Sequence, residues 1–554
     1  MGFHIKKGVL LNYIPENPAK PPEELVIPDG VTEIGKNAFI GNKTLRRVQL
    51  PDGLLKIGDS AFYGCTALKE ITLPEGLVSV GVTAFGACKK LRWLQLPDSL
   101  REIGSNAFGG TEWLRFADPL MIGGDILICY AGSDEELILP DGLRVIAANA
   151  MKRQHRPPER DVLRRVVIPE GVEEIGTQAF RDSAALEEIV LPQSLKTIGE
   201  SAFINCTHLR SVTLPEGLTE IPHNLFYGCQ ALTEIRIPQS VTEIGANAFY
   251  YCTGLQSVSL PAHLRSIGAT AFAECKALTD AEIPAQTVEI GANVFQHTPW
   301  ETEYPADFII HGDLLMKYKG TQQAAHVPEQ VRRIGDRAFE GRKITELVLP
   351  QQLTEIGAYA FSGCTQLNEI VIPASVRIIS ENAFAACKAA KTVRFEGTLP
   401  DCGKDAFAVM ESLAEMQFPD GTVQLAEYQR NSSWGYYYRN LINRILTCAV
   451  TKKDINQVVA QMMLDCFRAS HAPSAAKMIR RFADTVFIQL DKAGDTDGII
   501  FLLSQKELLT EKMLDKMLEY AIGAAQKSGS AEHQMLVMRA KEELFDVKEK
   551  RFHL

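Results

Sequence analysis

The stretch Gly64–Phe85, GCTALKEITLPEGLVSVGVTAF, contains the unit that repeats along most of this chain. Its Ala-Phe pair returns at a spacing of 23 residues, so the phenylalanine marks the register of each repeat. The phenylalanines form three series: Phe39, Phe62, Phe85 and Phe108; Phe180, Phe203, Phe226, Phe249, Phe272 and Phe295; and Phe339, Phe361, Phe384 and Phe407. A fixed period of this length is the sequence signature of a solenoid, in which each repeat packs only on its neighbours.

Each repeat predicts one turn of the solenoid. In Leu68–Pro74, LKEITLP, the apolar residues alternate with Glu70 and Thr72, which is the pattern of a short strand with one buried and one exposed face. Pro74 ends the strand because it has no backbone N–H to donate. Phe85 is expected to be the largest core side chain of the turn, and successive turns are expected to build a parallel sheet.

Three segments with alternating apolar residues around a glycine interrupt the repeat and predict β-hairpins. They lie within residues 1–20, 118–130 and 307–318. Phe108 and Met151, which takes the place of the next phenylalanine, are 43 residues apart instead of 23, and the spacing across the last hairpin is 44. Each internal hairpin is therefore expected to replace one turn. The prediction is about fifteen turns in blocks of four, seven and four, within residues 21–425.

The chain has twelve cysteines, of which eight occupy one position of the repeat. They are Cys65, Cys88, Cys206, Cys229, Cys252, Cys275, Cys364 and Cys387. A small, soft side chain in a fixed register predicts core packing, although stacked turns could also bring neighbouring thiols within reach of a disulfide. At the ends of blocks the position carries Thr111 or Thr298, and there we expect a less buried slot. No Cys-x-x-Cys pair and no cluster of histidines occurs, so neither a metal nor a cofactor is expected.

Two segments depart from the repeat. Residues 152–161, KRQHRPPERD, form a basic insertion that reads either as a tolerated surface loop or as an element for docking or cleavage. Ser433–Arg439, SWGYYYR, is an aromatic cluster that we expect to cover the end of the solenoid, with a ligand-stacking role as the alternative. From there the apolar spacing is helical, which predicts an all-α domain over residues 434–554.

The bulk composition excludes several functions. The formal net charge of −10 argues against nucleic acid as a partner, because nucleic-acid binding relies on many contacts from Lys and Arg to phosphate. No apolar run approaches the roughly 20 residues that a membrane span needs. The N-terminus lacks a small-residue cleavage site, so it is interpreted as mature structure and the expected location is the cytoplasm. Motifs of hydrolases, nucleotide-binding proteins and metalloproteases are absent, so we expect no enzyme, and we expect a monomer.

The skeleton L-x-x-I-x-L-P-x-x-L-x-x-I-G-x-x-A-F-x-x-C resembles the BspA-type (Treponema-type) leucine-rich repeat family over about residues 20–420. The resemblance implies an α/β repeat fold: a curved, right-handed solenoid with a parallel concave sheet, here with inserted hairpins and followed by the all-α domain. It also implies protein binding, often as a surface adhesin of bacteria and some protists. Ala493–Ala521 is similar to ankyrin-like helix pairs.

The candidate site consists of the exposed positions of the strand that carries Glu70 and Thr72, together with the equivalent positions of the other repeats. The remaining positions of a repeat are expected to lie in the core. The residues we single out on this surface, which we expect to be concave, are Arg47, Glu70, Trp93, Arg165, Glu188, Glu234, Arg236, Asp280 and Glu282. Trp93 is the candidate anchor, and the acids of the Glu188–Glu282 section suit basic side chains. The alternative is a solvated surface whose charges prevent aggregation.

Two functional hypotheses follow. The first is a non-enzymatic scaffold that binds protein or peptide partners inside a bacterial cell. The second is a surface adhesin for host or matrix proteins, exported by a non-classical route.

Overall fold

The computed structural model describes residues 2–116, 120–130, 132–151, 162–425, 455, 457–470, 473–528 and 531–546. The basic insertion 152–161 and the aromatic cluster 433–439 lie outside these residues. The chain divides into two compact units, Met1–Tyr304 and Pro305–Leu554, and each is described by itself.

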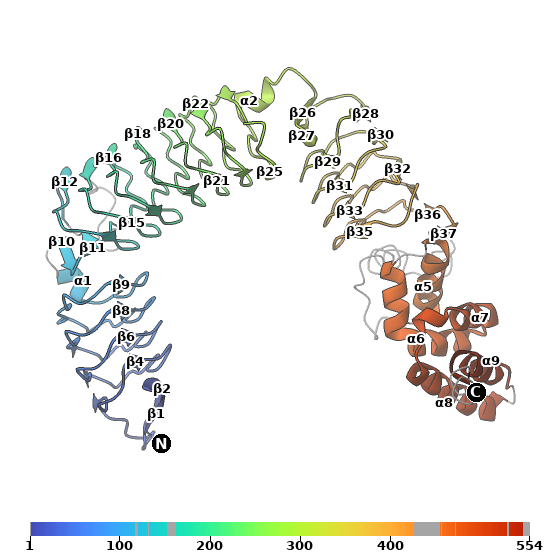
Figure 1. The fold of residues 1–554 in the computed structure, drawn as a ribbon, viewed down its shortest axis with the longest axis horizontal. Helices are drawn as coiled ribbons and strands as arrows, with labels where there is room; N and C mark the ends of the chain where they lie inside the picture. The colour runs from blue at the N-terminus through green and yellow to red at the C-terminus, as the bar shows by residue number, and fades with distance from the viewer. Residues whose placement is uncertain are drawn as a thin grey trace, which may run out of the picture. The chain divides into compact units, whose positions relative to one another are not determined.

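Most turns of the solenoid in unit 1 contribute one short strand to each of two ladders (Figure 1). The first ladder contains β3 (Glu24–Val26), β5 (Arg47–Gln49), β7 (Glu70–Ile71), β12 (Glu136–Ile138), β14 (Arg165–Val167), β16 (Glu188–Val190), β18 (Ser211–Val212), β20 (Glu234–Arg236), β22 (Ser257–Ser259) and β24 (Asp280–Ala281). The second ladder contains β4 (Glu33–Ile34), β6 (Lys56–Ile57), β8 (Ser79–Val80), β9 (Glu102–Ile103), β13 (Val145–Ile146), β15 (Glu174–Ile175), β17 (Thr197–Ile198), β19 (Glu220–Ile221), β21 (Glu243–Ile244), β23 (Ser266–Ile267) and β25 (Glu289–Ile290).

The pairing within both ladders is parallel and follows the repeat. Arg47 of β5 lies opposite Glu70 of β7, and Lys56 of β6 lies opposite Ser79 of β8, each pair 23 positions apart in the sequence. The two ladders lie on opposite sides of each turn. Figure 1 shows β16, β18, β20 and β22 along the outer side of the curve of unit 1, and β15, β21 and β25 along its inner side.

The hairpins replace turns, as the spacing predicted. They are β1 (Gly2–Lys6) with β2 (Val9–Ile14), β10 (Leu120–Gly123) with β11 (Ile126–Tyr130), and β26 (Phe308–His311) with β27 (Leu314–Tyr318). In each hairpin the second strand pairs in parallel with the next strand of the second ladder: β2 with β4, β11 with β13, and β27 with β29 (Arg333–Ile334). A hairpin therefore begins each block of regular turns.

The core is a stack of phenylalanine rings. Phe39, Phe62 and Phe85 stack with ring centroids 4.9 and 5.2 Å apart, at interplanar angles of 6° and 2°. The prediction for the cysteines is confirmed, since all eight are free thiols with 0% exposure. Their thiols donate to phenylalanine carbonyls of the preceding turn, as Cys65 Sγ does to Phe39 O at 3.2 Å.

The expectation of a less buried slot at the ends of blocks was wrong. Thr111 is 0% exposed and Thr298 is 1% exposed. Each hydroxyl donates to the phenylalanine carbonyl of its own turn, at 2.8 Å to Phe108 O and 2.6 Å to Phe295 O. Threonine also suits this place because Thr298 is the N-cap of α2 (Pro299–Thr302), and its Oγ1 accepts from Glu301 N at 3.2 Å. The end of a block thus needs a polar cap within a buried site.

Unit 2 has two ladders of its own after its hairpin. Its remaining strands are β28 (Ala324–His326), β30 (Glu346–Val348), β31 (Glu355–Ile356), β32 (Glu369–Ile372), β33 (Ile378–Ile379), β34 (Thr392–Phe395), β35 (Asp401–Cys402), β36 (Glu415–Phe418) and β37 (Gly421–Gln424). The helices that follow are α5 (Gln457–Ser470), α6 (Pro473–Ala493), α7 (Thr496–Ser504), α8 (Glu511–Ser528) and α9 (Glu532–Lys541). Leu425 belongs to the same apolar core as Met462 of α5, so helices cover this end of the solenoid.

Candidate protein-binding surfaces

The predicted site residues all lie on the first ladder of unit 1 or directly beside it, with their side chains directed to solvent. Arg165 is half-buried, and the other eight are exposed. One part of the prediction is wrong, namely the assignment of this surface to the concave side. A parallel sheet does line the inner side of the curve of unit 1, but it is built from the second ladder (Figure 1).

Five of the predicted residues form ion pairs with residues of neighbouring turns, and four of the five lie near the start of the first two blocks. Arg47 forms ion pairs with Glu24 and, at 3.7 Å, with Glu70. Arg165 repeats this arrangement with Glu136 and, at 3.1 Å, with Glu188. Hydrogen bonds to Glu24 and Glu136 raise the pKa of Arg47 and of Arg165, respectively. Each arginine offsets one of its two carboxylates, so each group of three charges keeps a net charge of −1.

The later section of the same ladder keeps its charge. Glu234, Asp280 and Glu282 are exposed and form no ion pair with any residue that the structure describes. Arg236 lies among them, but its guanidinium pairs with Glu216 at 3.6 Å. The surface from β20 to β24 is therefore acidic.

A hollow of about 880 Å³ lies over β3, β5 and β7 and is bordered by Trp93. Trp93 forms an isolated parallel bridge with Glu70 and is 75% exposed. Val26 lines the same hollow and is 63% exposed, so two large apolar side chains are presented to solvent there. Arg47, Glu70 and Trp93 were predicted from the sequence, and Val26 was not. Its signal was available, because Glu24-Leu25-Val26 has the alternation of the other first strands.

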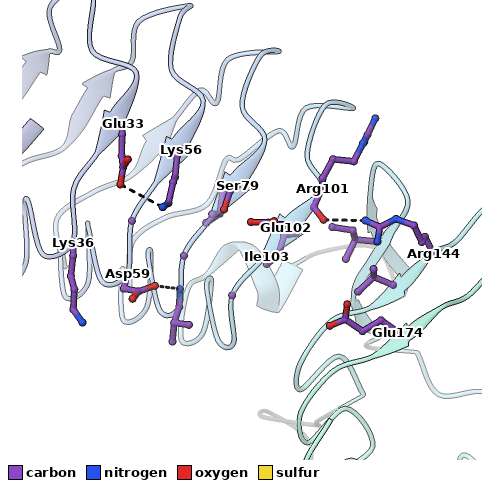
Figure 2. Close-up of a pocket in the computed structure, with 17 residues that line it drawn as sticks. Glu33, Lys36, Lys56, Asp59, Ser79, Arg101, Glu102, Ile103, Arg144 and Glu174 are labelled. Carbon is purple, nitrogen blue, oxygen red and sulfur yellow. Dashed lines mark hydrogen bonds and ion pairs between the residues drawn. The ribbon is translucent and has the colours of Figure 1, made fainter. Parts of the chain in front are cut away.

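A second hollow, of about 580 Å³, lies on the second ladder near β9 and the second hairpin (Figure 2). Its lining includes charged residues of several turns: Glu33, Lys36, Lys56, Asp59, Arg101, Glu102, Arg144 and Glu174. None of these residues was predicted as a site residue from the sequence.

Within the described ranges, no three side chains of His, Cys, Asp or Glu gather as a metal site would require. None of the helices in that part of the chain is long and apolar enough to cross a membrane.

Comparison with known proteins identifies the family. The model of the BspA type leucine rich repeat region matches in six copies, over residues 20–118, 162–300 and 316–433. The chain therefore belongs to the BspA-type leucine-rich repeat family, which confirms the resemblance seen in the repeat. No curated protein sequence matches the chain.

Several solved structures are similar to this chain. The leucine rich repeat protein TpLRR of T. pallidum is 31% identical, over 32% of this chain and 81% of its own, with a TM-score of 0.29. A leucine-rich repeat protein of Eubacterium ventriosum is 22% identical, over 52% and 88%, with a TM-score of 0.36. A leucine rich cell surface protein of Faecalibacterium prausnitzii is 23% identical, over 70% and 90%, with a TM-score of 0.29.

Proposed function

We propose that this chain is a non-enzymatic scaffold that binds protein partners through the first ladder of unit 1, with Trp93 as the anchor. The observation that carries the proposal is the exposure of Trp93 at the border of a hollow. A tryptophan buried at the centre of an interface commonly dominates the binding energy. In the free protein, a side chain of this size that is 75% exposed gains little from its position, so a partner that covers it would supply the missing contacts.

The surroundings of Trp93 favour a protein partner over a small charged ligand. Arg47, the cation among the residues that line the hollow, is already paired with two carboxylates. Val26 lies on the first strand of the series β3, β5 and β7, Trp93 follows the last strand, and the paired charges lie between them, so the hollow offers both apolar and polar contacts to a protein partner. Further along the ladder, the acids Glu234, Asp280 and Glu282 would favour basic side chains on the same partner.

The test compares proteins captured by three forms of the full chain: wild type, Trp93→Ala and Val78→Ala. Val78 is the matched control, because it is an exposed apolar residue of a nearby turn on the second ladder side. We expect at least one purified partner to bind wild type and Val78→Ala equally and to bind Trp93→Ala at least tenfold more weakly, since interface tryptophans often contribute about 2 kcal/mol or more. Equal affinities for all three forms would refute the proposal.

We also propose that the scaffold works in the cytoplasm of a bacterial cell. Its buried, unoxidised cysteines are typical of proteins in reducing compartments. Protease added to intact cells of the source organism should leave the protein uncut. Cleavage under those conditions, with a cytoplasmic marker intact, would favour the adhesin instead.

A further inference from the structure

The second ladder of unit 2 borders a hollow of about 560 Å³. Its lining comes from four successive turns and includes Arg332, Thr354, Arg377 and Asp401. The first three of these residues each directly precede a strand of the ladder, namely β29, β31 and β33. Because these strands pair in parallel in that order, the two arginines occupy the same position of the repeat two turns apart.

The guanidinium groups of both arginines are open to a ligand. Arg332 and Arg377 are exposed, and neither forms an ion pair with a residue that the structure describes. Arg332 Nη2 donates to Gln352 Oε1 at 3.1 Å, so its side chain leans toward the next turn of the ladder. By contrast, the neighbouring Arg333 is paired with Asp313 at 3.0 Å. The cations that line the hollow therefore differ from the one beside them, which already has a carboxylate.

The charges that line the hollow sum to +1, although the whole chain has a formal net charge of −10. Asp401 supplies the one carboxylate, and it lies in β35, one turn beyond Arg377 and not between the two arginines. Thr354 lies between them, and its short side chain donates from Oγ1 to the carbonyl of Arg332 at 3.0 Å. Glu396 is not part of the lining and is bonded to Arg394 and Gln351. The section between the two arginines is thus cationic and suits an anionic ligand.

The distance between the arginines limits the shape of that ligand. Paired strands lie about 4.8 Å apart, so two turns separate the arginines by about 10 Å along the ladder. A polyproline II segment has three residues per turn and rises about 3.1 Å per residue, so residues i and i+3 lie on one face about 9 Å apart. In a β-strand the same two residues would point to opposite faces. An α-helix reaches this spacing on one face only over about two turns, which is more chain than a hollow of small-ligand size holds.

We propose that this hollow binds an acidic segment of a partner protein in the polyproline II conformation, with glutamates at positions i and i+3. One glutamate accepts hydrogen bonds from the guanidinium of Arg332 and the other from that of Arg377, and the two residues between them pass over Thr354. The planar donor fork of arginine matches a carboxylate with two parallel hydrogen bonds. This site lies in unit 2 and does not involve Trp93, so it goes beyond the proposed function.

The test measures binding of a synthetic peptide to the full chain by fluorescence anisotropy, at low ionic strength because salt screens exposed charges. The probe is a labelled, end-capped Pro-Glu-Pro-Pro-Glu-Pro peptide. One control has the same composition with adjacent glutamates, Pro-Pro-Glu-Glu-Pro-Pro, and a second has Gln in place of both glutamates. We expect saturable binding of the parent peptide, binding of the adjacent form at least threefold weaker, and no binding of the Gln form.

Three outcomes with these ligands would overturn the proposal. The first is failure of the parent peptide to bind at millimolar concentration. The second is equal binding of the parent and adjacent forms, because the spacing of the arginines would then play no part. The third is displacement of the parent peptide by an equimolar concentration of inorganic phosphate, which would assign the hollow to a small anion.

Protein variants locate the site. Arg332→Gln and Arg377→Gln should each weaken the parent peptide by about threefold to fivefold, since single exposed ion pairs contribute modestly to affinity. Arg265→Gln is the matched control, because Arg265 is exposed and directly precedes β23 but has no arginine at this position in the turns beside it. Equal weakening by Arg265→Gln would overturn the proposal. Trp93→Ala should leave peptide binding unchanged, so failure of this site and failure of the Trp93 surface are distinguishable.

Discussion

Replacing Phe249 with alanine tests whether the stacked phenylalanines hold neighbouring turns together. Phe249 is 0% exposed, and its ring lies between those of Phe226 and Phe272, at centroid distances of 5.5 and 5.1 Å. Its carbonyl accepts from Cys275 Sγ at 3.2 Å, and this backbone contact survives the substitution. Phe249→Ala therefore removes the ring and both stacking contacts while leaving the local hydrogen bonds in place.

The expected loss of local stability is about 4 kcal/mol. Deletion of a buried phenylalanine side chain typically costs about 3–5 kcal/mol, because apolar burial is lost and a cavity remains. Two aromatic contacts are included in that figure, at roughly 0.5–1.5 kcal/mol each. The loss of stability should lie above the lower end of this range, because backbone hydrogen bonds on both ladders hold the neighbouring turns in register and prevent them from collapsing into the cavity.

Native-state hydrogen exchange measures this loss at individual amides. In a solenoid each turn contacts only its neighbours, so opening free energies should fall most between Phe226 and Phe272 and little in unit 2. Gln256→Ala, at an exposed position of the same section, serves as the control and should change them by less than about 0.5 kcal/mol. A loss below about 1 kcal/mol at these amides, or an equal loss throughout both units, would refute the assignment of the ring stack as the main contact between turns.

Three further predictions concern other parts of the chain. Gly268→Ala should destabilise the protein by about 1–3 kcal/mol in urea unfolding, because the new Cβ would lie 2.3 Å from Ala246 N. Gly53→Ala is the control and should be nearly neutral, because its new Cβ would meet no atom within 4 Å. Similar effects of the two substitutions would contradict the steric explanation. Burial raises the pKa of Cys275 and of Cys364 to about 12, so these thiols stay protonated in the folded protein at pH values where unfolded thiols, with pKa about 8.5, ionise. The free energy of unfolding should therefore fall as the pH rises from about 8.5 toward 12, and Cys275→Ala should reduce the slope; an unchanged slope would count against this cause. In the helices, His533 Nδ1 lies 2.6 Å from Asp491 Oδ1, and His533 Nε2 lies 3.0 Å from Thr496 Oγ1. His533→Ala should therefore reduce the free energy of unfolding by about 1–3 kcal/mol and lower the thermal midpoint. Met535→Ala is the control, because Met535 is exposed, and it should leave the midpoint unchanged.

The repeat predicted most of the fold because its information is local. A period of 23 residues places each phenylalanine over the previous one, and the lengths of the interruptions showed that a hairpin replaces a turn. The burial of Thr111 and Thr298 could not be predicted from the repeat in this way. A polar residue in a core register suggested exposure, but the short helix after Thr298 supplies the partner that allows the hydroxyl to be buried.

The candidate surfaces were predicted less completely than the fold, because they depend on contacts between turns. The alternation of apolar and polar residues identified the outward position of Trp93, but the hollow that it borders is formed by several turns together. Arg47 and Arg165 are each paired with two acids, and these pairs depend on the lateral register between strands. Neither fact is contained in one repeat.

By itself the sequence determined the family, the solenoid, the order of its blocks and which residues of a turn are buried, because period and alternation act within and between adjacent turns. Only the tertiary structure decided which ladder lies on the inner side of the curve in unit 1, since curvature arises from small differences in width between the two sides of a turn, summed over many turns. The break in the second ladder after β9 was also decided at that level. It exists because β11 pairs with β10 on one side and with β13 on the other, so no backbone donor among the described residues reaches the Ile103 carbonyl of the previous turn.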